Sequence, residues 1–134
     1  MSPMDISEAL GRQIPFATHL GVELLDRGDG RARLRLALRP ELMNSFNAAH
    51  GGVVMTLLDI AMAVAARTRD PDAIGAITIE MKASFLSAGE GTLTVDGVCL
   101  HLGKSVAFCE ARAHGADGKL AATATGTFML RHPR

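Results

Sequence analysis

The sequence contains no tryptophan and no tyrosine, and only two of its 134 residues are cysteine. It also lacks an excess of either charge, because 14 basic residues are balanced by 14 acidic ones. A formal net charge of zero argues against a nucleic-acid-binding surface and against attraction to an anionic membrane. A small ligand that is neutral or recognised by a few local charges is expected instead.

Long hydrophobic runs are missing as well. No stretch reaches the ~18 uncharged apolar residues that are typical of a membrane span. The start of the chain, MSPMDISEALGRQ, lacks the apolar centre of a secretory signal. The sequence therefore predicts a cytoplasmic protein that does not enter a membrane.

The two cysteines, Cys99 and Cys109, are equally far in sequence from Lys104, so a hairpin centred there would make them cross-strand neighbours. That geometry could permit a disulfide. A reducing cytosol favours free thiols, and buried cysteine commonly packs as a small apolar residue. Neither cysteine has the spacing of a metal site. We therefore favour two packed thiols and expect no metal.

The length fits a single domain that spans residues 1–134. Its N-terminal part predicts a short helix that is capped by Asp5, carries Glu8 in its first turn and ends before Pro15. Two strand-like runs, GVELL and RARLRLAL, then flank a Gly/Asp turn. In the second run alanine and leucine alternate with arginine, which is typical of a half-buried strand with a basic outer face.

The central segment, from Gly51 to about Arg67, is rich in alanine, leucine and methionine and predicts a helix. It is apolar on nearly every side, so the helix is expected in the core of the domain. Asp59 is the one charged side chain between Gly51 and Ala66. A carboxylate in apolar surroundings must be exposed, hydrogen-bonded or used in the function.

Four further strand-like runs follow, AITIEMKASFL, GTLTVDGVCLHL, SVAFCEARAH and KLAATATGTFML. The short turn segments between them suit antiparallel neighbours in one meander. Strands, one buried helix and then a meander predict an α+β fold, in which a long helix lies across a curved antiparallel sheet.

The helix begins with His50, Gly51 and Gly52, where the first N–H groups lack intrahelical partners and carry the positive end of the helix dipole. An oxyanion would be stabilised there, and glycine lets a ligand approach the backbone closely. Asp59 lies eight residues beyond Gly51, which is about 12 Å along the axis. One helix therefore cannot present both groups to one carbonyl. If both act on one centre, they come from two copies of the chain, which predicts an obligate dimer.

The motif Asn44-x5-His50-Gly51-Gly52-x6-Asp59 resembles that of the hotdog-fold acyl-CoA thioesterases of the phenylacetate-degradation (PaaI) type. The likeness extends along nearly the whole chain, through IPFATHLGVEL, TIEMKASFLSAG and DGKLAATATGTF in the same order. The resemblance implies a hotdog fold, with a central helix wrapped by an antiparallel sheet. It also implies hydrolysis of an acyl-CoA thioester to a free acid and CoA, without a metal or cofactor. The sites would lie between the subunits of a homodimer, and such dimers often pair into homotetramers.

Carried onto this sequence, the resemblance makes Asp59 the general base or nucleophile and makes the Gly51 amide the donor that polarises the thioester carbonyl. Asn44 and His50 would position the thioester or the base. Thr78 falls where related enzymes place a serine or threonine that helps to hold the attacking water.

The resemblance also implies contacts with CoA, in the helix start and in the turn LGKS. The residues concerned are Gly52, Gly103, Lys104 and Ser105. A lysine in a hairpin turn is also commonly just solvated, so Lys104 has a second interpretation. The family usually has glycine three residues after the motif asparagine, where this chain has Asn47. Asparagine tolerates the left-handed conformation better than most residues, so the turn is expected to survive.

Two other functions remain open at this stage. A hotdog hydratase or dehydratase acting on acyl-CoA would usually pair a histidine with a carboxylate in a different motif, which this sequence lacks. A non-catalytic acyl-CoA-binding module would keep the fold without turnover, and Asp59 counts against it. The sequence also leaves open the acyl group, aromatic or aliphatic, and the route, through an activated water or an Asp59 acyl anhydride.

Overall fold

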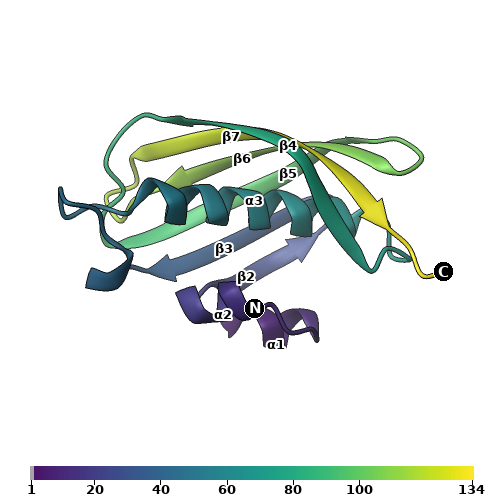
Figure 1. Cartoon of the computed structure of the whole chain (residues 1–134), viewed down its shortest axis with the longest axis horizontal. Coiled ribbons are helices and arrows are strands. Elements are labelled where there is room, and N and C mark those ends of the chain that lie inside the picture. Colours follow the sequence, from purple (N-terminus) through teal and green to yellow (C-terminus); the bar gives the residue numbers. More distant parts are fainter. Residues whose placement is uncertain (1) are drawn as a thin grey trace.

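The computed structural model describes residues 2–134, in which a curved antiparallel sheet wraps around one long helix (Figure 1). The helical segments are α1 (Ile6–Leu10), α2 (Pro15–Leu20), the 3₁₀ turn η1 (Pro40–Leu42) and α3 (Gly51–Thr68). The strands are β1 (Met4–Asp5), β2 (Glu23–Gly28), β3 (Arg31–Ala37), β4 (Gly75–Phe85), β5 (Thr92–Leu102), β6 (Val106–His114) and β7 (Leu120–Arg131). The predicted α+β class, with its helix across a sheet, is confirmed, and the arrangement is that of the hotdog fold.

The sheet is open, and its strand order is β1-β2-β3-β5-β6-β7-β4. The predicted meander is therefore wrong for β4, which pairs with β7 at one edge of the sheet instead of with β5. After α3 the chain forms β4 at the edge of the sheet beside β7. It then crosses back, so that β5 pairs with β3. The segment SAGE is consequently a crossing between distant strands and not a hairpin turn. Apolar alternation identifies strands, but it does not specify which strands pair.

The N-terminal helices follow local capping rules. Asp5 caps α1 by accepting a hydrogen bond from Ser7 N at 3.0 Å, as predicted. Helix α2 was not predicted from the sequence; Pro15 occupies its first turn, and Gly21 ends it in a left-handed conformation with φ of 88°. Proline is favoured at a helix start because the missing N–H would be unpaired there.

Helix α3 lies across the sheet (Figure 1), and its apolar side chains belong to the same buried core cluster as those of the strands. Leu57, Leu58 and Ala61 are fully buried. Strand β5 approaches the helix so closely that a Cβ on Gly97 would lie 2.4 Å from the Ala61 carbonyl oxygen. Glycine is therefore required at position 97 for the helix to pack against the sheet.

Within residues 2–134, α3 is the one helix that would qualify as a membrane-spanning segment by length and composition, since its 18 residues have a mean hydropathy of 1.4. It carries Asp59 and Arg67, however, and half of it is buried inside the structure. That placement is the one expected of a core helix wrapped by a sheet.

Cys99 and Cys109 are direct cross-strand partners on β5 and β6, as the hairpin prediction required. Both are buried, and both are free thiols, which confirms the packing interpretation. Burial, together with the neighbouring Cys99, raises the pKa of the Cys109 thiol from 9.0 to about 12. The pair thus behaves as small apolar side chains in the core.

Candidate active site

Asp59 and Thr78 meet in a groove between α3 and the beginning of β4. Thr78 Oγ1 donates a hydrogen bond to Asp59 Oδ1 at 2.6 Å. The strand register shifts between Thr78 and Glu80, so a β-bulge lies directly beside this contact. The second carboxylate oxygen of Asp59 and the lone pairs of the Thr78 hydroxyl remain available to a water molecule.

This Asp59 groove is open and has a volume of about 340 Å³. Besides Asp59 and Thr78, its lining residues are Gly52, Met55, Thr56 and Met81. Asp59 is partly exposed there. Its carboxylate is therefore stabilised by solvent and by the hydrogen bond from Thr78, although the helix around it is apolar. A carboxylate that is accessible and held in one orientation can accept a proton from water or attack a carbonyl carbon.

His50 organises the first turn of α3. Its Nδ1 accepts a hydrogen bond from Gly52 N at 2.8 Å, and its carbonyl oxygen accepts from Val53 N at 2.9 Å and Val54 N at 3.1 Å. Gly51 N is the remaining donor of this turn, and it has no hydrogen-bond partner within residues 2–134. The structure therefore leaves one free amide at the positive end of the helix, where an oxyanion would be stabilised.

Gly51 and Gly52 differ in how much room the structure leaves for a side chain. A Cβ on Gly52 would lie 3.1 Å from His50 Nδ1, so a side chain there would disturb the histidine cap. A Cβ on Gly51 would only make ordinary contact, 3.7 Å from the Phe85 ring. The packing of the chain thus explains the glycine at position 52 and leaves room for a ligand beside the amide of Gly51.

Asn44 shapes the loop that precedes the helix. Its Oδ1 accepts hydrogen bonds from Phe46 N at 2.8 Å and Ala48 N at 3.2 Å, while its Nδ2 has no protein partner in the described part of the chain. Asn47 adopts the left-handed conformation with φ of 58°, as expected for the position where the family usually has glycine. Asn44 therefore supports the loop and keeps an amide donor available.

A second groove, of about 310 Å³, lies beside Asn44 and Gly51. It shares no lining residue with the Asp59 groove. The predicted site residues are thus gathered in two places: Asn44, His50 and Gly51 at the start of α3, and Asp59 with Thr78 further along it. This separation agrees with the distance expected from their spacing on one helix.

Phe46 and Phe85 also line the second groove, and neither was predicted as a site residue from the sequence. Phe46 is 86% exposed, an unusual position for an aromatic side chain. Its place in the polar segment NSFN was the signal that could have identified it. These rings give the groove an apolar wall.

The turn LGKS joins β5 to β6 at the end of the sheet where β4 begins. Gly103 N donates to the Val106 carbonyl oxygen at 2.9 Å, and Ser105 O accepts from Leu130 N at 2.8 Å. Lys104 is exposed. Neither groove includes these three turn residues. Leu130 pairs with Ala76 on β4, which places the turn at the same end of the molecule as Thr78.

Residues 46–122 match the family model of the thioesterase superfamily. The chain belongs to the thioesterase superfamily. A Saccharolobus solfataricus protein named as an esterase is 33% identical over 112 residues, which cover 83% of this chain and 79% of that protein. The 1,4-dihydroxy-2-naphthoyl-CoA hydrolase of Listeria monocytogenes is 26% identical over 117 residues, 86% of this chain and 94% of that enzyme.

Among solved structures, the PaaI protein from the phenylacetic acid degradation operon of E. coli has a TM-score of 0.83 against this thioesterase-superfamily protein. The match covers 92% of this chain and 89% of that one, at 22% sequence identity. The resemblance stated from the sequence is therefore confirmed at the level of family and fold.

Proposed function

We propose that this thioesterase-superfamily protein hydrolyses an acyl-CoA thioester to a free acid and CoA, in a site shared between two copies of the chain. The observation that carries the proposal is the pair of separate grooves on α3. One holds the free Gly51 amide and the other holds Asp59 with Thr78. Two antiparallel helices across a two-fold axis would bring the Gly51 groove of one copy to the Asp59 groove of the other.

Strand β4 supports a dimer because it is an exposed edge of the sheet. Ile77 and Ile79 are 44% and 53% exposed, and Phe85 is 55% exposed. A long edge strand with apolar side chains is a template for pairing with another chain. Pairing of β4 with β4 of a second copy would cover these side chains and continue the sheet. The homodimer, and its further pairing into a homotetramer, belong to the proposal.

In this arrangement the Gly51 amide donates to the thioester carbonyl oxygen and stabilises the negative charge that develops on it. His50 Nδ1 is an acceptor, so its ring proton lies on Nε2 and is available to the substrate. Asp59 of the partner subunit takes a proton from the attacking water, whose oxygen bonds to the carbonyl carbon. The C–S bond then breaks, and CoA leaves as a thiolate that takes up a proton. Attack by Asp59 itself, through an anhydride that water later hydrolyses, uses the same geometry.

The remaining contacts of the proposal concern CoA. Gly52, Gly103, Lys104 and Ser105 are the residues that the family resemblance assigns to it. The turn 103–105 lies at the Asp59 end of the molecule, in keeping with a ligand that reaches the carboxylate. The similarity to a CoA hydrolase favours hydrolysis over hydration of an enoyl-CoA. An assay of thiol release distinguishes an enzyme from a module that binds acyl-CoA without hydrolysing it.

The test is thiol release from a panel of aryl and aliphatic acyl-CoAs by wild type, Asp59→Asn and Asp96→Asn. Asp96 is a suitable control because it is a carboxylate on β5 that pairs with Arg33 at 2.7 Å, on the outer face of the sheet. We expect Asp59→Asn to lower kcat at least ~10²-fold and Asp96→Asn to leave it unchanged. Binding of every acyl-CoA with hydrolysis of none would support the binding module instead.

A further inference from the structure

A third cavity, of about 290 Å³, lies at the C-terminal end of α3, away from both grooves. Its walls come from β2, from the last turns of α3 and from the loop that follows. Two arginines line it, Arg27 of β2 and Arg67 of α3. Arg12, just after α1, adds a third positive charge close to Arg67, because its charge lowers the pKa of the Arg67 guanidinium.

Arg67 carries a buried polar atom that lacks a hydrogen-bond partner among the described residues. Its Nε is buried and has no hydrogen-bond partner within residues 2–134. Burial lowers the pKa of the Arg67 guanidinium, and the charges of Arg12 and Arg27 lower it further. A buried donor without an acceptor, beside two like charges, is unfavourable for folding unless an anion satisfies it.

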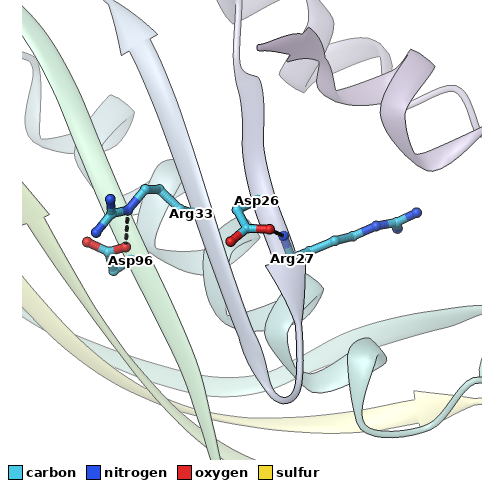
Figure 2. A network of polar contacts seen from close by, with 4 residues as sticks. All are labelled: Asp26, Arg27, Arg33 and Asp96. Carbon is cyan, nitrogen blue, oxygen red and sulfur yellow. Dashed lines mark hydrogen bonds and ion pairs between the residues drawn. The ribbon is translucent and has the colours of Figure 1, made fainter. Parts of the chain in front are cut away.

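Arg27 points toward the same cavity. It pairs with Ala32, which is buried, so its side chain leaves β2 on the inner face of the sheet. Figure 2 shows that the side chain extends away from Asp26, whose carboxylate accepts a hydrogen bond from the Arg27 backbone N at 2.9 Å. The guanidinium itself only reaches the Ala9 carbonyl oxygen, at 3.4 Å. Arg27 thus has no carboxylate partner in the described chain.

Other arginines of this protein do have carboxylate partners. The described ion pairs are Arg33–Asp96, Arg35–Glu23 and Arg39–Glu41. Arg12, in contrast, donates to the carbonyl oxygen of Ile74. The cavity wall holds one carboxylate, that of Asp70, and it is already bound to His132 Nε2 at 2.7 Å. Arg27 and Arg67 therefore line a cavity without a carboxylate partner in the described chain, and Arg12 adds its positive charge nearby.

We propose that Arg27 and Arg67, with the positive charge of Arg12 close by, bind a phosphate group in this cavity. Guanidinium groups match phosphate oxygens with paired N–H donors, and three positive charges suit a dianion better than a single carboxylate. A bound phosphate would accept from the guanidinium groups that line the cavity and would relieve the repulsion among the three side chains.

The position of this phosphate cavity relates it to the proposed reaction. A Cβ on Gly75, the first residue of β4, would lie 3.6 Å from Arg12 Nη1. Thr78 is three residues further along β4, which is about 10 Å. The phosphate can therefore belong to CoA itself, an assignment that rests on the proposed function, or to a separate phosphate-bearing molecule. The shared chemistry is a phosphate monoester or diphosphate, and the experiment separates the two sources.

The first arm measures binding of inorganic phosphate and of free CoA by thermal shift and calorimetry, against sodium chloride at equal ionic strength. We expect both to stabilise wild type, and Arg27→Gln and Arg67→Gln to weaken binding at least about tenfold. Arg31→Gln is the matched control, since Arg31 is an exposed arginine opposite Val98 on β5. Without ligand, the two cavity variants should melt no lower than wild type, because repulsion is relieved. Asp70→Asn should tighten the binding of phosphate.

The second arm compares KM for an acyl-CoA with KM for the same acyl group on pantetheine, which carries no phosphate. An increase of about tenfold for acyl-CoA alone in the arginine variants, with kcat unchanged, identifies CoA as the source. An unchanged KM together with arginine-dependent phosphate binding identifies a separate ligand. The proposal is overturned if the arginine variants match wild type in both arms. The first arm needs no turnover, so it remains decisive even if the protein hydrolyses none of the thioesters.

Discussion

Thr78 Oγ1 and Asp59 Oδ1 are joined by a hydrogen bond of 2.6 Å, which connects the beginning of β4 to the middle of α3. Nineteen residues separate the two side chains in sequence. The contact holds Oδ1 of the carboxylate in place. Because the carboxylate group is rigid, the direction of Oδ2 is then fixed as well. The catalytic orientation of Asp59 in the proposed reaction therefore depends on where the sheet places β4.

Replacing Thr78 by valine keeps the β-branched shape but removes the hydroxyl donor. We expect Thr78→Val to lower kcat about 10- to 100-fold, since a hydrogen bond to a charged group contributes about 1.5–3 kcal/mol. Thr78→Ser should recover most of the activity. Thr127→Val is the matched control, because Thr127 makes a similar 2.7 Å hydrogen bond to Glu80. Neither Thr127 nor Glu80 lines either groove. Equal kcat values for the valine and serine variants would show that the hydroxyl has no part in the reaction.

Replacing Gly51 by proline removes its N–H with little change of backbone. Proline is favoured at the first helical position, and His50, with φ of −59° and ψ of 137°, already has the conformation that precedes proline. We expect Gly51→Pro to lower kcat about 10²-fold or more, because a donor to the oxyanion is lost. Gly51→Ala keeps the amide and should stay far more active. Similar losses in both variants would point to steric disturbance of the groove and not to the amide.

The shared site can be tested by combining two inactive variants. If Gly51 and Asp59 act from different subunits, a mixed dimer of Gly51→Pro and Asp59→Asn contains one site with both native groups. Co-refolding at equal concentrations should then restore about one quarter of wild-type activity, since half of the dimers are mixed and each has one intact site. A site built within one chain predicts no recovery at all.

Gly97→Ala tests the close approach of β5 to α3. The added Cβ would meet the Ala61 backbone at 2.4 Å, so the sheet and the helix must move apart. We expect the free energy of unfolding to fall by about 2–3 kcal/mol, measured by urea denaturation. Gly103→Ala is the control, because its Cβ would lie 3.6 Å from the Val106 carbonyl oxygen, an ordinary contact. Equal stability of the two variants would contradict the packing described here.

The raised pKa of Cys109 predicts a pH dependence at the alkaline end. Between pH 9.0 and about 12 the unfolded chain loses this thiol proton while the folded chain keeps it. Rising pH therefore favours unfolding in that window, and the contribution of the group is complete below pH 9. Cys109→Ala should flatten the fall of the unfolding free energy above pH 9. The native thiol should also resist Ellman's reagent until the protein is denatured.

The elements that the sequence predicted well are those set by local signals. His50 and the two glycines marked the start of α3, and the helix ends only one residue beyond the expected Arg67. Alternation of apolar residues identified β5, β6 and β7 because each has one buried face. The position of β4 could not be predicted in this way, because its pairing with β7 depends on the path of the chain after α3.

The same distinction holds for the site. The motif spacing indicated that Gly51 and Asp59 lie too far apart on one helix to reach the same carbonyl, which follows from the helical rise alone. The contact between Asp59 and Thr78 depends on the edge position of β4 and on the bulge after Thr78. Neither feature can be predicted from the neighbouring residues in sequence. The arginine cavity likewise joins α1, β2 and α3, so only the folded chain brings Arg27 and Arg67 to one cavity.

The placement of β4 also sets the order in which the molecule can be completed. During synthesis β4 leaves the ribosome well before β7, the strand with which it pairs, because β5 and β6 are made in between. Until the last strand arrives, Thr78 has no fixed place beside Asp59, and the sheet cannot close over the helix. Contacts of such long range in sequence are slow to form. The twelve residues of β7, far from the motif in sequence, therefore decide when the nascent protein brings Thr78 beside Asp59.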